Sequence, residues 1–165
     1  MRYELNVDGM TEISNLLGQL EEKAPSVAAS ALFEGAAVMA EEVKKGAEGI
    51  RTAPFKYAKP GERRLPSPEE KQIIVDAGIG IAKFDKNGTE IDTSVGYRNA
   101  GYAELAGNQG PIPGSVNAVN TGTSFLIKQP FVRKAARTGE TKAIRKMTEH
   151  IDNAWNEYIK KMNKL

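Results

Sequence analysis

Residues 72–97 read QIIVDAGIGIAKFDKNGTEIDTSVGY and contain the clearest structural signal in the chain. Apolar residues alternate with other residues over 73–81, and the same period of two returns over 89–97, which is typical of half-buried strands. Asn87 and Gly88 lie between the two runs, and both residues tolerate the positive φ angles of a type I′ turn. The stretch therefore predicts an antiparallel β-hairpin with one apolar face, and such a face requires a helix packed against it.

The segment before this hairpin predicts mainly helix. Arg2–Val7 alternates and predicts a short strand, and Asp8 follows it as the N-cap of a first helix. Pro25 fits the first turn of a second helix, because its missing N–H has no intrahelical partner at that position. An alanine-rich stripe then continues to about Glu48, which predicts a long helix with one apolar face.

The segment after the hairpin ends in another long helix. Pro130 predicts its entrance, and Gly139 is a candidate point of interruption. An apolar stripe follows at helical spacing: Ile144, Met147, Ile151, Trp155, Tyr158 and Met162. The order of elements predicts an α+β fold, in which a sheet based on the antiparallel hairpin packs against a long helix of the N-terminal half and a long C-terminal helix.

The length of 165 residues predicts one domain over 1–165, with two long loops. Residues 52–71 are rich in proline and basic residues, and 107–122 are rich in glycine and proline. Structureless loops of more than about 12–15 residues are uncommon in compact domains unless they are functional or disordered. The segment Thr52–Lys71 is therefore interpreted either as an arm that becomes ordered on a partner or as a floppy insertion.

Composition excludes several classes of protein. The chain has no cysteine, which removes disulfides, zinc–cysteine sites and thiol nucleophiles, and it has one histidine, His150. It contains no uncharged apolar run of the roughly 18 residues that span a membrane, so we expect a soluble protein made in a cytoplasm. The net charge is only +2, but residues 127–165 hold ten Lys/Arg against four acids, a net +6, which leaves −4 on 1–126. Such an asymmetry can serve self-association or docking, but a basic helix face exposed to solvent is its more common meaning.

No catalytic constellation follows from the sequence. Gly78 and Gly80 lack the third glycine and the following helix of a dinucleotide-binding motif. Asp76, Glu90 and Asp92 lie on or near the predicted hairpin and are the available acids for a divalent ion, but the alternation places Asp76 and Glu90 away from its apolar face. We therefore expect no enzyme activity, no cofactor and no metal.

Three short motifs together resemble a known family. Tyr102-Ala103 comes first, Gly122-Thr123-Ser124 follows, and Pro130-Phe131-Val132-Arg133-Lys134-Ala135 then opens the predicted C-terminal helix. The combination resembles a signature of the tailed-phage family that is named after gene product 10 of phage Hong Kong 97. The members of this family are head–tail joining or tail completion proteins. The predicted N-terminal helices and the hairpin over 75–97 are similar to that family as well.

The resemblance implies a structural virion protein of a long-tailed phage. It implies a homo-oligomeric ring, expected to be a hexamer, that is assembled in the host cytoplasm and lies at the head–tail junction. Its partners would be the connector or stopper and the tail-tube or tail-terminator proteins, with DNA only as passing cargo and no membrane. The candidate interface residues are on the 52–71 arm and on the basic C-terminal helix: Lys56, Tyr57, Arg63, Arg64, Arg133 and Lys134.

Two alternatives to this interpretation stay open. The first is a small DNA-binding or DNA-processing protein that uses the basic arm and the basic C-terminal helix on phosphates. The second is a tail terminator or another neck protein. The motif residues also have a reading without the family, because Pro130 fixes a helix start, Phe131 can anchor that helix on the sheet, and Gly122 permits a turn. On that reading Tyr102, Gly122, Thr123, Pro130 and Phe131 specify the fold.

Overall fold

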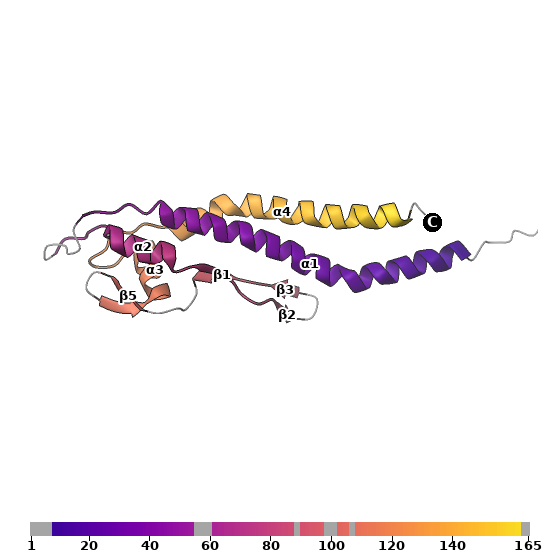
Figure 1. Ribbon diagram of the computed structural model, residues 1–165, viewed down its shortest axis with the longest axis horizontal. Helices are drawn as coiled ribbons and strands as arrows, with labels where there is room; N and C mark the ends of the chain where they lie inside the picture. Colours follow the sequence, from indigo (N-terminus) through magenta and orange to yellow (C-terminus); the bar gives the residue numbers. More distant parts are fainter. Residues whose placement is uncertain (1–7, 55–60, 88–89, 98–101, 106–107, 163–165) are drawn as a thin grey trace, which may run out of the picture.

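The protein has an α+β fold in which two long helices lie side by side and smaller elements gather along one flank (Figure 1). The computed structural model describes residues 8–54, 61–87, 90–97, 102–105 and 108–162. Its helices are α1 (Asp8–Glu48), α2 (Pro68–Asp76), α3 (Ile112–Thr121) and α4 (Phe131–Met162). Its strands are β1 (Ile79–Ile81), β2 (Asp85–Asn87), β3 (Glu90–Asp92), β4 (Val95–Tyr97), β5 (Tyr102–Leu105) and β6 (Asn108–Pro111). The predicted packing of an antiparallel hairpin against two long helices is confirmed.

Helix α1 is one continuous helix, so the predicted break before Pro25 is wrong. Pro25 lies inside the helix, where it removes one backbone hydrogen bond and its ring crowds the preceding turn. Figure 1 shows that α1 bends within its N-terminal half, the half that contains this proline. Proline explains the bend without ending the helix. The predicted strand Arg2–Val7 lies outside the described residues.

The central hairpin exists, but it is shorter and less regular than predicted. Strand β1 pairs with β4, with Ile79 opposite Tyr97, and β2 pairs with β3, with Asn87 opposite Glu90. Between the two ladders, residues 82–84 on one strand face only 93–94 on the other, which is the arrangement of a β-bulge. Because Asn87 belongs to a strand, the two connecting residues are 88–89, one position later than predicted, and they lie outside the described residues.

Helix α2 replaces the first part of the predicted strand and the end of the predicted loop. The Ser67 hydroxyl accepts a hydrogen bond from the Glu70 N–H at 3.2 Å, and the Glu70 carboxylate accepts one from the Ser67 N–H at 2.7 Å. This capping box, followed by Pro68 at the first helical position, fixes the start of the helix. The alternation over 72–78 was therefore misread, and only 79–81 form a strand.

The segment 107–122 is also more ordered than predicted. Strand β6 pairs antiparallel with β5, and α3 follows directly. Gly122 ends α3 with a φ of 81°, a left-handed conformation that favours glycine. The predicted loop over 107–122 is wrong, because its prolines lie at the first turn of a helix, where proline is tolerated.

The hydrophobic core lies where the C-terminal end of α1 and the first turns of α4 meet α2 and α3. Ile74, Val119 and Leu126 have at most 1% of their surface exposed. Val43, Ala47, Ile50, Ile112, Val116, Phe131 and Ala135 belong to the same buried cluster. The rest of the long helix pair therefore extends away from the core.

Two glycine–methionine contacts hold α1 and α4 close together. A Cβ added at Gly35 on α1 would lie 2.7 Å from the Met147 Cγ on α4, and one added at Gly139 on α4 would lie 2.7 Å from the Met39 Sδ on α1. Each glycine thus provides the space for a methionine of the opposite helix. The sequence predicted Gly139 as a point of interruption, but α4 continues through it, and this packing explains why a glycine stands there.

Replacing Gly35 with leucine is expected to lower the free energy of unfolding by about 1–3 kcal/mol, because overpacking forces Met147 or the helix backbone to move. Gly18 lies in the same helix with nothing within 4 Å of its added Cβ, so Gly18→Leu is a matched control that should stabilise the helix slightly. Thermal unfolding followed by circular dichroism measures both. Equal stability of the two variants would contradict the proposed close contact.

Candidate functional site

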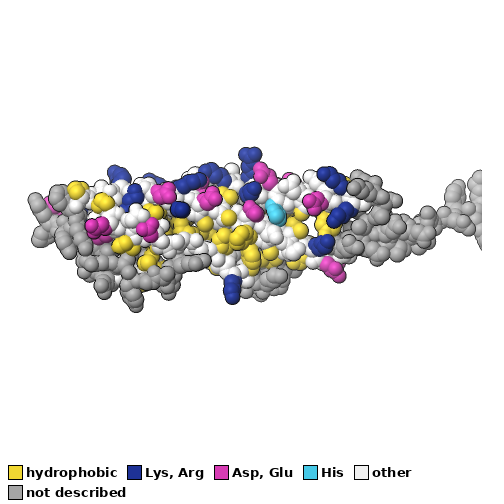
Figure 2. All heavy atoms as spheres, viewed as in Figure 1, with side chains coloured by type: hydrophobic (Ala, Val, Ile, Leu, Met, Phe, Trp, Pro, Cys, Tyr) yellow, Lys and Arg dark blue, Asp and Glu magenta, His cyan; other side chains and the backbone are white. Residues whose placement is uncertain are grey.

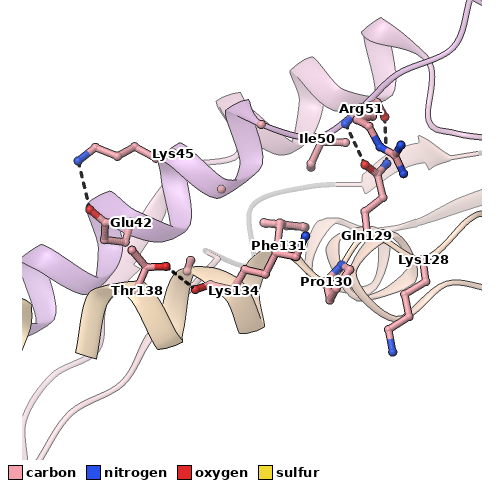
Figure 3. Close-up of a pocket in the computed structure, with 13 residues that line it drawn as sticks. Glu42, Lys45, Ile50, Arg51, Lys128, Gln129, Pro130, Phe131, Lys134 and Thr138 are labelled. Atoms are coloured by element: carbon pink, nitrogen blue, oxygen red, sulfur yellow. Dashed lines mark hydrogen bonds and ion pairs between the residues drawn. The ribbon is translucent and has the colours of Figure 1, made fainter. Parts of the chain in front are cut away.

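A basic hollow of about 480 Å³ lies between the C-terminal end of α1 and the start of α4 (Figure 3). Four of the residues that line it are basic: Lys45, Arg51, Lys128 and Lys134. Glu42 is the acid among the residues that line it. Among the described residues that line the hollow, basic side chains therefore outnumber acidic ones.

Gln129 is a buried polar residue among those that line this hollow. Its side-chain oxygen accepts a hydrogen bond from the Arg51 N–H, and its side-chain nitrogen donates to the Arg51 carbonyl, both at 2.9 Å (Figure 3). Its backbone N–H donates to the Val119 carbonyl at 2.9 Å. This one buried glutamine thus connects the end of α1, the end of α3 and the start of α4. Sequence reasoning missed it, although it directly precedes Pro130.

The predicted motif residues shape the loop that leads into α4. Gly122 turns the chain, and the Thr123 hydroxyl accepts hydrogen bonds from the N–H groups of Phe125 at 3.3 Å and Leu126 at 3.0 Å. Helix α4 begins directly after Pro130, as predicted, and Phe131 is 6% exposed within the core. Gly122, Thr123 and Phe131 thus take part in a turn, in loop hydrogen bonds and in the core. Tyr102 lies in β5, opposite Pro111.

One acid of the hollow is held in its charged form. The Glu42 carboxylate forms ion pairs with Lys142 at 2.9 Å and with Lys45 at 3.3 Å. Hydrogen bonds from Lys142 first, and then from Lys45, lower the pKa of this carboxyl. Glu42 therefore stays ionised and joins α1 to α4.

The predicted interface residues differ in their exposure to solvent. Arg64 is buried and donates to the Glu70 carboxylate at 2.7 and 2.6 Å, so it belongs to the fold, and its expected role as a contact residue is wrong in this conformation. Arg63 is exposed on the segment before α2. Arg133 and Lys134 are exposed on the first turn of α4, where Lys134 joins the basic hollow. Lys56 and Tyr57, also predicted as interface residues, lie outside the residues that the structure describes.

The acids considered for metal binding do not form a cluster among the described side chains. Asp76 is the last residue of α2, outside the hairpin strands, and accepts a hydrogen bond from the Gln72 amide at 2.8 Å. Asp92 is exposed on β3, and Glu90 lies on the same strand. In the described part of the chain, no group of three or more His, Asp or Glu side chains is placed to hold a metal ion. His150 is half-buried on α4.

A second surface, which we call the apolar groove, runs between α1 and α4 beyond the core. Ile144, Ile151 and Trp155 on α4 are 53%, 47% and 51% exposed. Figure 2 shows hydrophobic side chains gathered along this face of the helix pair. The sequence identified the apolar stripe of α4, but only the packed structure shows that Ile144, Ile151 and Trp155 stay about half exposed.

In comparisons with protein families, curated proteins and solved structures, no match to this chain was found. Among the helices that the structure describes, none contains a stretch long and apolar enough to cross a lipid bilayer. The function must therefore be inferred from the basic hollow, the apolar groove and the motif residues of the chain itself.

Proposed function

We propose that this protein is a non-enzymatic structural subunit of a long-tailed phage virion. In this proposal the chain forms a homo-oligomeric ring, a hexamer, at the head–tail junction, where it completes the tail or joins it to the head-side connector. The ring surrounds the channel through which DNA passes. The resemblance of the Tyr102, Gly122-Thr123 and Pro130-Phe131 motifs to the joining family supports the proposal, and so does the position of Pro130-Phe131 at the start of α4.

The observation that carries the proposal is the unequal charge of the two exposed long helices. Helix α1 contains eight acids and three lysines, a net charge of −5, whereas α4 contains eight Lys/Arg and four acids, a net charge of +4. In a head-to-tail contact, which is heterologous, the acidic helix of one subunit can face the basic helix of the next. Heterologous contacts that close make rings.

The proposal is tested by native mass spectrometry of the purified chain, with and without isolated tail tubes. We expect a ring in solution and its attachment to tubes that lack this protein. A phage whose gene for this chain is deleted should release particles that are not infectious. Infectious virions from the deletion phage would overturn the proposal.

The basic hollow favours one second candidate, a DNA-binding protein. Lys45, Arg51, Lys128 and Lys134 line it, and of these Lys45 is paired with Glu42 at 3.3 Å, which leaves the other three to contact phosphates. That candidate predicts DNA binding that weakens steeply with salt and is lost in a Lys128→Glu/Lys134→Glu variant. The structural proposal instead predicts that this variant loses tail attachment while any DNA binding stays weak. A tail terminator or another neck protein would also form a ring.

A further inference from the structure

The apolar groove is lined by side chains from α1, α4 and β3. Two hollows, of about 230 and 380 Å³, lie along it, and Ala28 of α1 and Ile151 of α4 line both of them. Ile91 of β3 lines the larger one. None of the described residues that line either hollow carries a charge. A partner that covers the groove must therefore present apolar side chains to it.

The α4 wall of the groove carries an uncharged stripe with the spacing of a helix–helix contact. The stripe stands at positions i, i+4, i+7 and i+11, so the helical repeat places its members along one side of α4: Ile144, Thr148, Ile151 and Trp155. All four side chains are exposed. The stripe is roughly 16 Å long at the helical rise of about 1.5 Å per residue. An exposed apolar surface of this kind is typical of an interaction site.

The charge of this wall is nearly balanced, but it is unevenly placed. Residues 144–158 contain two basic and three acidic side chains, so a nucleic acid or a strongly charged peptide gains little attraction here. Arg145 stands next to the first residue of the stripe, and Asp152 follows seven residues later, about two turns along the same edge. A complementary partner must therefore place an acid opposite Arg145 and a base opposite Asp152.

A second copy of α4 that runs in the opposite direction meets this requirement. If a two-fold axis passes between Thr148 and Glu149, Arg145 of each copy lies opposite Asp152 of the other, because both residues are equally far from the axis along the helix. The same axis places Ile144 of one copy between Ile151 and Trp155 of the other, so the apolar side chains interdigitate. A parallel copy in register would instead place like charges opposite each other, which is unfavourable.

The contact that Arg145 makes in its own subunit does not prevent this pairing. Its guanidinium pairs with the Glu149 carboxylate at 3.0 Å, and the two side chains are 82% and 50% exposed. An ion pair that is exposed to this extent contributes little to stability. The guanidinium has five N–H donors, so it can bind Asp152 of a second copy while it keeps Glu149.

We propose that two copies of this chain pair through the apolar groove, with their α4 helices antiparallel across a two-fold axis near Thr148. The inference goes beyond the proposed function, because an isologous contact of this kind pairs copies and does not by itself close a ring. A ring whose subunits also pair in this way becomes two rings that face in opposite directions. Loss of the pairing then leaves single rings.

Cysteine cross-linking tests the contact, because the natural chain contains no cysteine. A Thr148→Cys chain places its thiol beside the two-fold axis, so we expect a disulfide-linked homodimer under mild oxidation, since a disulfide requires Cα atoms within about 7 Å. Asn153→Cys is the matched control, because Asn153 is exposed on the same helix and follows Ile144 by about two and a half turns, on the side opposite the stripe. Equal cross-linking of the two variants would overturn the pairing. A Thr148→Cys chain that stays unlinked would also overturn it and would mean that another partner covers the groove.

Exchange of the two charges tests the direction of the helices. Arg145→Asp and Asp152→Arg each place like charges opposite one another in a homodimer, so each variant alone should pair about tenfold more weakly than the natural chain. In a mixture of the two variants, both charge pairs of the heterodimer are opposite again, and its affinity should return to that of the natural chain. Native mass spectrometry separates the species, because the two variants differ in mass. Homodimers as stable as the heterodimer would overturn the antiparallel arrangement.

An Ile151→Ser variant separates this inference from the proposed function. It should keep its helical circular dichroism, because Ile151 is 47% exposed in one subunit, and it should lose the pairing. The assembly seen by native mass spectrometry should then fall to half its mass while the ring persists. An assembly of unchanged mass would overturn the pairing and leave the proposed function standing. Infectious virions from the deletion phage would overturn the function whatever the cross-linking shows.

Discussion

Replacing Glu70 with leucine is expected to lower the free energy of unfolding by about 3–5 kcal/mol. The side chains of Arg64 and Glu70 are 6% and 2% exposed and form two hydrogen bonds of 2.7 and 2.6 Å. The substitution leaves the Arg64 guanidinium buried without this carboxylate, and it removes the acceptor of the Ser67 N–H at the start of α2. Urea unfolding followed by circular dichroism measures the loss.

Two further variants show whether burial is the cause. Glu149→Leu breaks the Arg145–Glu149 pair, which has a similar distance of 3.0 Å but is exposed, so we expect a change of about 1 kcal/mol or less. Arg64→Leu combined with Glu70→Leu removes both buried charges and should recover part of the lost stability. Equal effects of Glu70→Leu and Glu149→Leu would contradict a structural role for the buried pair.

The same pair explains one limit of sequence reasoning. Arg64 was predicted as an interface residue because it lies in a basic, proline-rich stretch. Composition counts a positive charge but does not show whether a carboxylate neutralises it in the fold. Here the partner is Glu70, which also completes the capping box of α2. The sequence contains that box, because Glu70 follows Ser67 by three residues. The alternation of Ile73 and Val75 instead led to the prediction of a strand.

Long-range features were predicted better than short elements. The paired long helices and the hairpin follow from extended apolar patterns, and the start of α4 follows from Pro130, whose chemistry is local. Helix α3 was missed because Pro113 and Gly114 are typical of loops, although Ile112, Val116 and Val119 have helical spacing. The apolar groove needs the relative position of α1 and α4, which the periodicity of one helix does not contain.

Replacing Phe131 with alanine is expected to cost about 3–5 kcal/mol of stability, because it leaves a cavity in the core. Phe131 is 6% exposed, and its backbone oxygen would lie only 3.2 Å from a Cβ added at Gly46, so α1 and α4 approach closely at this point. The surroundings therefore have little freedom to collapse into the space. Equilibrium unfolding in urea measures the effect.

Phe33→Ala is the matched control, since it removes the same side chain from a position that is 49% exposed, and its cost should be much smaller. A near-normal stability of the Phe131→Ala variant would show that its ring is not part of the core. The effect on assembly follows from the fold, because Phe131 opens the helix that carries both the basic hollow and the exposed stripe. A subunit that loses this anchor should lose the ring at temperatures where Phe33→Ala still assembles.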